Sequence, residues 1–331
     1  MAADIGSGDE TSLSDDVSFL CVGLTVVDMI TVVGKYPEED SDQRGISFRK
    51  QRGGNASNAS TVLTSLGNTC QYLGVLPSTS DPDYRWLKDD FNGHGIKTDL
   101  CVNSDRTCPM ANVVVSRDTG SRTIIFCDNG QPELSLQQFM SNAGKSLHCF
   151  TWIHFELRPN VEDYLHMLET VEEYRTKTAQ RTGKEPHTVT PYVSVEIEKP
   201  ELSNPERAMM LADVIFISKD WARCKGWEDM TTAVSSASRW CRPHCTVICP
   251  WAEEGAAAWC NNEVVTSTAS PPGEVIDTLG AGDTFVAGFL HTIARHKTVS
   301  ESLNFACKLA AAKCTIDGFK GLQGLVKIEV R

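Results

Sequence analysis

Long apolar runs are absent from this sequence of 331 residues. No stretch approaches the roughly 18 consecutive apolar residues that a membrane-spanning helix requires, so we expect no such helix. A basic surplus is also lacking, because 43 Asp and Glu outnumber 31 Lys and Arg and leave a net charge of −12. Neither a nucleic acid nor an anionic membrane surface would attract such a chain. A nucleotide ligand is compatible with this charge, because local dipoles and a metal ion bind its phosphates.

A signal-peptide pattern is lacking at the start, where residues 1–16 are small, polar and acidic. We interpret residues 1–16 as a disordered lead-in. The 13 Cys residues are scattered, mostly within apolar runs, which is typical of reduced thiols rather than of a disulfide framework. Together these features predict a cytoplasmic protein.

Short apolar segments alternate with helical patterns along most of the chain. The expected strands are residues 19–24, 72–75, 152–155, 192–195, 214–217 and 245–249. The expected helices are residues 56–66, 81–91, 161–175, 201–211, 230–240, 282–296 and 300–315. This alternation predicts an α/β protein with a doubly wound, mostly parallel sheet and helices on both faces. Residues 176–190 are polar and rich in Thr and Lys, and we expect a surface loop there.

Two segments interrupt this alternation, because residues 28–33 and 110–127 are typical of β structure without intervening helices. A small β element added to a parallel core often forms a lid or an interface. The expected division is an α/β core and a small β-sheet lid that forms an interface with a second copy of the chain. The core is expected to span residues 17–27, 52–106 and 128–331, and the lid residues 28–51 and 107–127.

The strongest chemical signal is DTLGAGDTF, from Asp277 to Phe285. Gly280 and Gly282 allow a tight turn, so that successive N–H groups can point into one concavity. If a helix begins near Gly282, these amides lie at its positive end, where a phosphoryl group is stabilised. Asp283 would then lie beside the anion, able to accept a proton from an attacking hydroxyl. Taken alone, the segment is equally compatible with an acidic first-turn residue of an ordinary helix.

A second signal is RGGNASN, residues 52–58, in which a Gly pair precedes a helix. Asn55 and Asn58 are three residues apart and therefore share one helix face. Amides both donate and accept hydrogen bonds, as neutral ligands rich in hydroxyls require. Alone, this segment is better explained as a flexible loop with an Asn N-cap. A polyol-binding amide pair and an anion hole with a carboxylate together favour a phosphotransferase.

Both segments resemble the two signatures of the ribokinase-like (PfkB) carbohydrate kinases, and further matching segments extend the resemblance over about residues 19–321. Within this family the chain is similar to the fructokinases that act on the 1-hydroxyl group. The resemblance implies ATP-dependent, in-line phosphorylation of a ketohexose, most simply of D-fructose to fructose 1-phosphate. A ribose or nucleoside kinase of the same fold is one alternative, and a catalytically weak nucleotide-binding regulatory protein is another.

The resemblance also implies a role for each candidate site residue. Asp283 would be the general base, with the backbone amides of Gly280, Ala281 and Gly282 as the anion hole. The residues expected to bind sugar hydroxyls are Asp28, Gly54, Asn55 and Asn58. The residues expected to face ATP are Arg122, Lys219, Ala252, Glu253, Glu254, Gly255, Gly280 and Gly282.

Further implications concern assembly and ions. Asp40, in the lid, would reach the sugar site of the neighbouring protomer in a homodimer. Mg²⁺ would accompany ATP, without an assigned ligand set, and K⁺ is expected near the loop at Asp277 and Thr278. Three positions depart from the family pattern and indicate an altered nucleotide affinity, namely Leu157, Ser270 and Val286.

Overall fold

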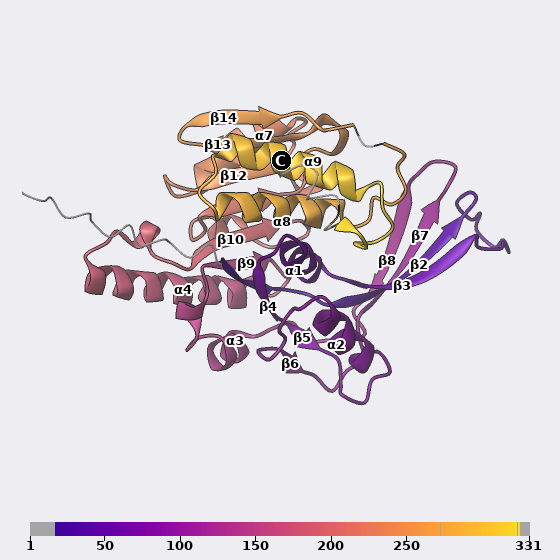
Figure 1. Cartoon of the computed structure of the whole chain (residues 1–331), viewed down its shortest axis with the longest axis horizontal. Helices are drawn as coiled ribbons and strands as arrows, with labels where there is room; N and C mark the ends of the chain where they lie inside the picture. Colours follow the sequence, from indigo (N-terminus) through magenta and orange to yellow (C-terminus); the bar gives the residue numbers. More distant parts are fainter. Residues whose placement is uncertain (1–16, 272, 323, 325–331) are drawn as a thin grey trace, which may run out of the picture.

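The computed structural model describes residues 17–271, 273–322 and 324, so the lead-in expected at residues 1–16 lies outside the described residues. An eight-stranded sheet forms its centre (Figure 1). The strands are β1 (Ser18–Val22), β4 (Thr69–Leu73), β9 (Trp152–Glu156), β10 (Tyr192–Ile197), β11 (Val214–Ile217), β12 (Thr246–Pro250), β13 (Ala256–Cys260) and β14 (Glu263–Ser267). Their order is β14-β13-β12-β11-β10-β9-β1-β4, parallel from β12 to β4. An antiparallel hairpin, β13 and β14, extends one edge.

Helices cover both faces of this sheet. They are α1 (Asn55–Ser65), α2 (Tyr84–Gly93), α3 (Leu136–Asn142), α4 (Val161–Thr182), α5 (Glu206–Met209), α6 (Lys219–Cys224), α7 (Met230–Ala237), α8 (Ala281–Ile293) and α9 (Val299–Lys313). One core cluster includes residues of α3, α4, α5 and α7, and another includes residues of α1, α8 and α9. The predicted doubly wound, mostly parallel α/β architecture is confirmed. Within the described part of the chain, no helix is long and apolar enough to cross a membrane.

A separate four-stranded sheet projects from one end of the central sheet (Figure 1). Its order is β3 (Ser47–Gly53), β2 (Val26–Val33), β7 (Met110–Ser116) and β8 (Arg122–Cys127). One face packs against the core, because Ile30 and Val113 cluster with Leu279. The sequence analysis did not identify β3, whose charged residues hide its alternation. We call this four-stranded sheet the lid. A third, two-stranded sheet pairs β5 (Val75–Leu76) with β6 (Val102–Asn103).

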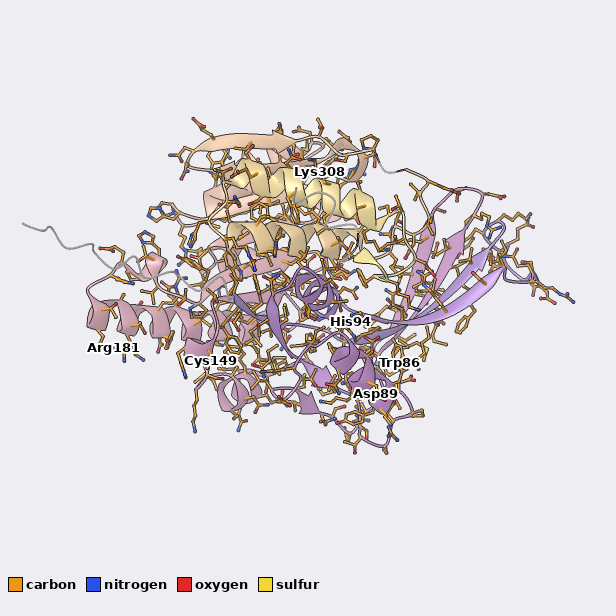
Figure 2. All side chains as sticks on the ribbon, viewed as in Figure 1. Trp86, Asp89, His94, Cys149, Arg181 and Lys308 are labelled. Atoms are coloured by element: carbon orange, nitrogen blue, oxygen red, sulfur yellow. The ribbon has the colours of Figure 1, made fainter. Side chains whose placement is uncertain are left out.

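Helix α4 is longer than expected, so the prediction of a surface loop from residue 176 is wrong over residues 176–182. The polar composition of this segment concealed a buried stripe at helical spacing. Its buried members include Tyr164, Leu168, Val171, Arg175 and Ala179. The helix ends at Gly183, which has the left-handed φ of 67° expected of a C-terminal glycine. Figure 2 shows Arg181 in this last stretch, at the end of α4 farthest from the lid.

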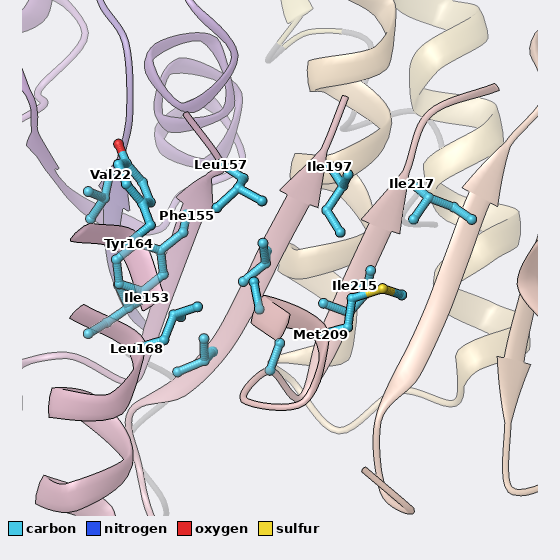
Figure 3. Packing of buried hydrophobic residues seen from close by; sticks show 14 of the residues in the cluster. Val22, Ile153, Phe155, Leu157, Tyr164, Leu168, Ile197, Met209, Ile215 and Ile217 are labelled. Atoms are coloured by element: carbon cyan, nitrogen blue, oxygen red, sulfur yellow. The ribbon is translucent and has the colours of Figure 1, made fainter. Parts of the chain in front are cut away.

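The core beneath α4 holds the strand ends in place. Ile153 and Phe155 of β9 point toward Tyr164 and Leu168 of α4 (Figure 3). The rings of Phe155 and Tyr164 meet edge to face, with centroids 6.1 Å apart. Burial of such side chains contributes roughly 1.5–3 kcal/mol each. The carboxyl ends of the parallel strands therefore form a rigid edge, where ligands of this kind of sheet usually bind.

Candidate active site

A cavity of about 1030 Å³ lies where this edge of the sheet meets the lid and helices α8 and α9. Most residues that the sequence marked as site candidates line it. They are Asp28, Gly54, Asn55, Asn58, Arg122, Lys219, Ala252, Glu253, Gly255, Gly280, Ala281, Gly282 and Asp283. Two candidates do not line it: Asp40 is exposed in the loop between β2 and β3, and the carboxylate of Glu254 lies 3.9 Å from the ammonium of Lys219.

The start of α8 presents backbone donors to this cavity. Gly280 is the N-cap with a φ of 79°, and a Cβ there would meet the ring of Phe319 at 2.6 Å. The N–H of Ala281 donates to Thr278 O at 3.2 Å, and the N–H of Thr284 donates to Gly280 O at 2.9 Å. Among the described residues, the amides of Gly282 and Asp283 have no backbone acceptor. Such free amides at a helix N-terminus are suited to an anion.

Asp283 stands in the first turn of α8 and is buried. Asn58 donates an amide hydrogen bond to its Oδ2 at 2.7 Å. Burial raises the pKa of Asp283 to about 8, opposed by the Asn58 hydrogen bond and reinforced by the charges of Glu198, Glu156 and Asp28. A carboxyl group with this pKa can gain and lose a proton near neutral pH, as a general base must.

The two Asn side chains are anchored to carboxylates rather than free. Asn55 Nδ2 donates to Glu196 Oε1 at 3.2 Å and to Glu198 Oε2 at 3.0 Å. Asn58 Oδ1 is buried and has no hydrogen-bond partner among the described residues. An acceptor of this kind is costly to bury unless a ligand hydroxyl donates to it. The site therefore offers one unused amide oxygen next to Asp283.

Three glutamates of the cavity wall were missed by the sequence analysis: Glu156, Glu196 and Glu198. Glu156 Oε2 accepts from the backbone N–H groups of Leu24 and Ala56 at 3.1 and 3.0 Å, which ties the end of β1 to the start of α1. Burial raises the pKa of Glu156 and that of Glu196 above the usual glutamate range. The available signal was position, because all three residues lie within the last two positions of a buried parallel strand or directly after it.

Two cationic side chains line another part of the cavity. Arg122 comes from the lid, and Lys219 comes from the segment after β11. Arg122 Nη1 donates to Thr278 Oγ1 at 2.9 Å and so bridges the lid to the loop before α8. The ammonium of Lys219 lies 5.2 Å from the ring centroid of Trp251. Small side chains of α9 form the adjoining wall, including Ala310 and Ala311. This combination suits a flat, apolar base attached to phosphates.

The carboxylate of Asp277, at the start of the same loop, accepts several hydrogen bonds. Its Oδ2 accepts from Arg49 Nη2 at 2.9 Å, from Lys313 Nζ at 2.8 Å and from the backbone N–H of Gly318 at 3.0 Å. Lys313 Nζ also donates to the main-chain oxygen of Asp277 at 2.9 Å. Burial by itself would raise the pKa of Asp277, but the charge and hydrogen bond of Lys313 outweigh it and the pKa is lowered.

The ions expected from the sequence can be tested against these contacts. The K⁺ expected at this loop does not fit the oxygens of Asp277, because the Lys313 ammonium already holds both the carboxylate and the main-chain oxygen. Within residues 17–271, 273–322 and 324, no group of three or more His, Cys, Asp or Glu side chains is arranged to hold a metal ion.

Comparison with known proteins identifies the family. The family model of the pfkB family carbohydrate kinases matches residues 17–320. The chain belongs to this family. The pfkB-family chain is also 38% identical over 310 residues to ketohexokinase from Mus musculus, which covers 93% of this chain and 99% of that protein. It is a carbohydrate kinase, and its reaction is the ATP-dependent phosphorylation of a sugar.

Solved structures share the fold of this carbohydrate kinase. A putative ribokinase from Agrobacterium tumefaciens aligns with a TM-score of 0.76 at 18% identity, covering 95% of this chain and 97% of that one. The ribokinase of Arabidopsis thaliana, solved with ribose and ATP, aligns with a TM-score of 0.70 at 18% identity, covering 92% and 94%. At these identities the likeness concerns the fold, and it confirms the ribokinase-like architecture.

Proposed function

We propose that this kinase phosphorylates a ketohexose, D-fructose in the simplest case, at its 1-hydroxyl group. Asp283 carries the proposal: a buried carboxyl group with a pKa of about 8 lies beside the free amides at the start of α8. The similarity to a ketohexokinase over nearly the whole chain supports the ketose as acceptor.

In the proposed reaction, the sugar binds between the lid and α1. Asn58 Oδ1 and the carboxyl group of Asp28 would accept hydrogen bonds from its hydroxyls, with Gly54 and Asn55 completing the wall. Burial raises the pKa of Asp28 to about 7, although the charge of Arg49 opposes this. Asp28 is therefore close to a state in which it can either accept or donate a hydrogen bond at neutral pH.

The transfer step follows from the position of Asp283. The 1-hydroxyl oxygen forms a bond to the γ-phosphorus, and its proton passes to Asp283. The bond between the γ-phosphorus and the bridging oxygen breaks, and its electron pair leaves with ADP. The amides of Gly280, Gly282 and Asp283 would stabilise the charge on the γ-phosphoryl oxygens, a form of electrostatic catalysis. The amide of Ala281, expected to join them, donates to Thr278 O at 3.2 Å.

ATP would occupy the other part of the cavity. Arg122, Lys219 and the turn from Ala252 to Gly255 would face its phosphates, with Glu253 and Glu254 in that turn. Mg²⁺ fits this site, because it is usually bound by one or two carboxylates together with substrate phosphates. Glu196 and Glu198 on the cavity wall offer such carboxylate oxygens, and bound Mg²⁺ would neutralise phosphate charge.

A coupled ADP-release assay tests the substrate. Fructose, ribose, adenosine and a reaction without acceptor are compared, and NMR of the product locates the phosphate. The highest kcat/KM for fructose with a 1-phosphate product supports the proposal. A preference for ribose or adenosine supports a different kinase of this fold. If none of the acceptors raises ADP release above that of the Asp283→Asn variant, the result supports a regulatory nucleotide-binding protein.

A homodimer is the second part of the proposal, because the lid exposes large apolar side chains. Phe48, Ile124, Ile125 and Phe126 are 60%, 49%, 53% and 45% exposed. The strand register places Phe48 and Ile125 on the outer face of the lid, whereas Ile124 and Phe126 line the cavity. Two such sheets related by a two-fold axis would bury the outer face and cover the sheet edges. Asp40, exposed in the β2–β3 loop, would then reach the sugar of the other protomer.

Sedimentation should therefore report a dimer. Asp40→Ala should weaken sugar use without weakening dimerisation, whereas Asp42→Ala, an exposed neighbour, should behave as wild type. A fully active monomer at assay concentration would overturn both the dimer and the role of Asp40.

A cytoplasmic location is also part of the proposal. All 13 Cys thiols are free, which is typical of proteins in reducing compartments. Fractionation of cells that express the untagged chain measures the compartment directly.

A further inference from the structure

Lys313 ends helix α9, and its side chain is completely buried. No other lysine is buried in the described part of the chain. Its ammonium donates to two oxygens of one residue, the main-chain oxygen and Oδ2 of Asp277, at 2.9 and 2.8 Å. The ammonium is therefore held against Asp277 inside the loop that precedes α8. Burial lowers the pKa of Lys313, and the charge and hydrogen bond of Asp277 oppose this.

Stability alone gives little reason for this arrangement. A buried ion pair is costly to desolvate, and well-packed apolar side chains of similar volume often stabilise a protein as much or more. Apolar side chains also lie near the ammonium, because Leu309 is buried on the same helix and the ring centroid of Phe319 is 5.7 Å from Nζ. We therefore infer that the buried lysine has a function in the site.

The contacts of Asp277 connect the ammonium to the anion hole. Asp277 Oδ1 accepts from the backbone N–H of Leu279 at 2.9 Å, and Leu279 directly precedes the N-cap Gly280. Lys313 thus orients the carboxylate, and the carboxylate orients the turn whose next residues present their amides to the cavity. Arg49 of the lid contacts the same carboxylate, so the lid is attached to this charge as well.

The two oxygens that accept hydrogen bonds from the Lys313 ammonium are of the type that coordinates hard cations. One is a main-chain carbonyl oxygen and the other a carboxylate oxygen, both preferred by hard cations. The resemblance to the family leads to the expectation of K⁺ at this loop, but a lysine of the chain itself fills the position beside Asp277.

We propose that the Lys313 ammonium is a built-in monovalent cation, which orders the Asp277–Gly282 loop in place of K⁺ and makes the enzyme independent of added K⁺. The inference rests on the proposed role of this loop as the anion hole. Lys313 acts as a positioning residue, because it touches Asp277 and not the reacting atoms.

The test begins with the wild-type enzyme in choline chloride and in KCl at equal ionic strength. The two salts should support the same kcat and the same Tm. Several-fold activation by K⁺, or a K⁺-specific rise in Tm, would overturn the proposal without any variant. The Tm comparison needs no sugar, so it remains decisive even if the proposed substrate is wrong.

The second arm uses Lys313→Met, which keeps an unbranched side chain of similar length and removes its charge. In choline its kcat should fall by roughly tenfold or more, because the loop donors are displaced from the transferred phosphoryl group. KCl or ammonium chloride should restore part of this loss and raise the Tm of the variant. Full activity of Lys313→Met in choline would also overturn the proposal.

Two controls separate this effect from others. Lys308→Met changes an exposed lysine of the same helix, labelled in Figure 2, and should match the wild type in every salt. Asp283→Asn should lose turnover without any response to K⁺, which distinguishes a missing base from a missing cation. If Lys313→Met does not fold, the wild-type comparison alone decides.

Discussion

Asp277 and Asp283 lie six residues apart at the two ends of one loop, and both are buried, yet their charge states differ. The carboxylate of Asp277 is held by two cationic side chains and two backbone amides, and its pKa is lowered. Asp283 receives one neutral amide bond and faces other carboxylates, and burial raises its pKa to about 8. Partners, and not burial, decide which carboxylate is a permanent ion and which can exchange a proton.

The largest expected effect is on turnover. Asp283→Asn should lower kcat by roughly two to four orders of magnitude, the usual contribution of a general base. Binding of sugar and ATP should change little, because Asn keeps the shape and can accept the bond from Asn58. ADP release measures kcat, and calorimetry measures both affinities. A variant that retains more than about a tenth of wild-type turnover would show that Asp283 is not the base.

The comparison also predicts opposite stability effects. Asp277→Asn leaves the Lys313 ammonium buried without its counter-charge and should lower the free energy of unfolding by about 3 kcal/mol. Asp283→Asn should instead raise the free energy of unfolding. Because the pKa of Asp283 is raised in the folded state, its carboxyl group destabilises the wild-type fold increasingly as the pH rises toward about 8. This gain should be absent at about pH 4, grow as the pH rises, and reach several kcal/mol at about pH 8, because each unit of pKa shift corresponds to about 1.4 kcal/mol. Urea denaturation at both pH values gives the two signs, and equal signs would remove the contrast.

The pH profile of kcat/KM sharpens the same point. The base acts only when ionised, so kcat/KM for the sugar should rise about tenfold per pH unit below about pH 8 and level off above it. Asp277 should add no limb in this range, because its pKa is lowered. Rates measured from about pH 5.5 to pH 9.5 test this, with Asp283→Asn as the control that should lose the limb. A flat profile from about pH 5.5 upward would contradict the raised pKa.

The smallest effects concern the Asn pair. Asn55→Ala and Asn58→Ala should each weaken sugar use by about 1–3 kcal/mol, or roughly 5- to 150-fold in KM, with a much smaller change for ATP. Asn58→Ala should also raise the pKa of the rate limb, because its hydrogen bond lowers the pKa of Asp283. Saturation curves for both substrates provide the measurement. Losses of equal size for sugar and ATP would indicate a purely structural role at the start of α1.

Local patterns were predictable because neighbouring residues produce them. The alternation of apolar strands and helical stripes predicted the order of most elements, and DTLGAGDTF predicted the tight turn before α8. Strand β3 was missed because its charged side chains obscure the period of two, and the end of α4 was missed because its buried stripe includes Arg175. Arg175 is tolerated there because Asp213 accepts from both of its terminal nitrogens, at 2.9 and 3.2 Å.

The sequence by itself determined the fold class, the family and the identity of the candidate base. The tertiary structure alone decided the state of the site, because pKa values depend on groups that are far apart in the chain. Asn58 and Asp283 meet across 225 residues, and Lys313 reaches Asp277 across 36. The roles of Glu196 and Glu198, and the cation inside the loop, arise only when the strands and α9 pack together. No local pattern contains that information, since burial and charge pairing are properties of the folded chain.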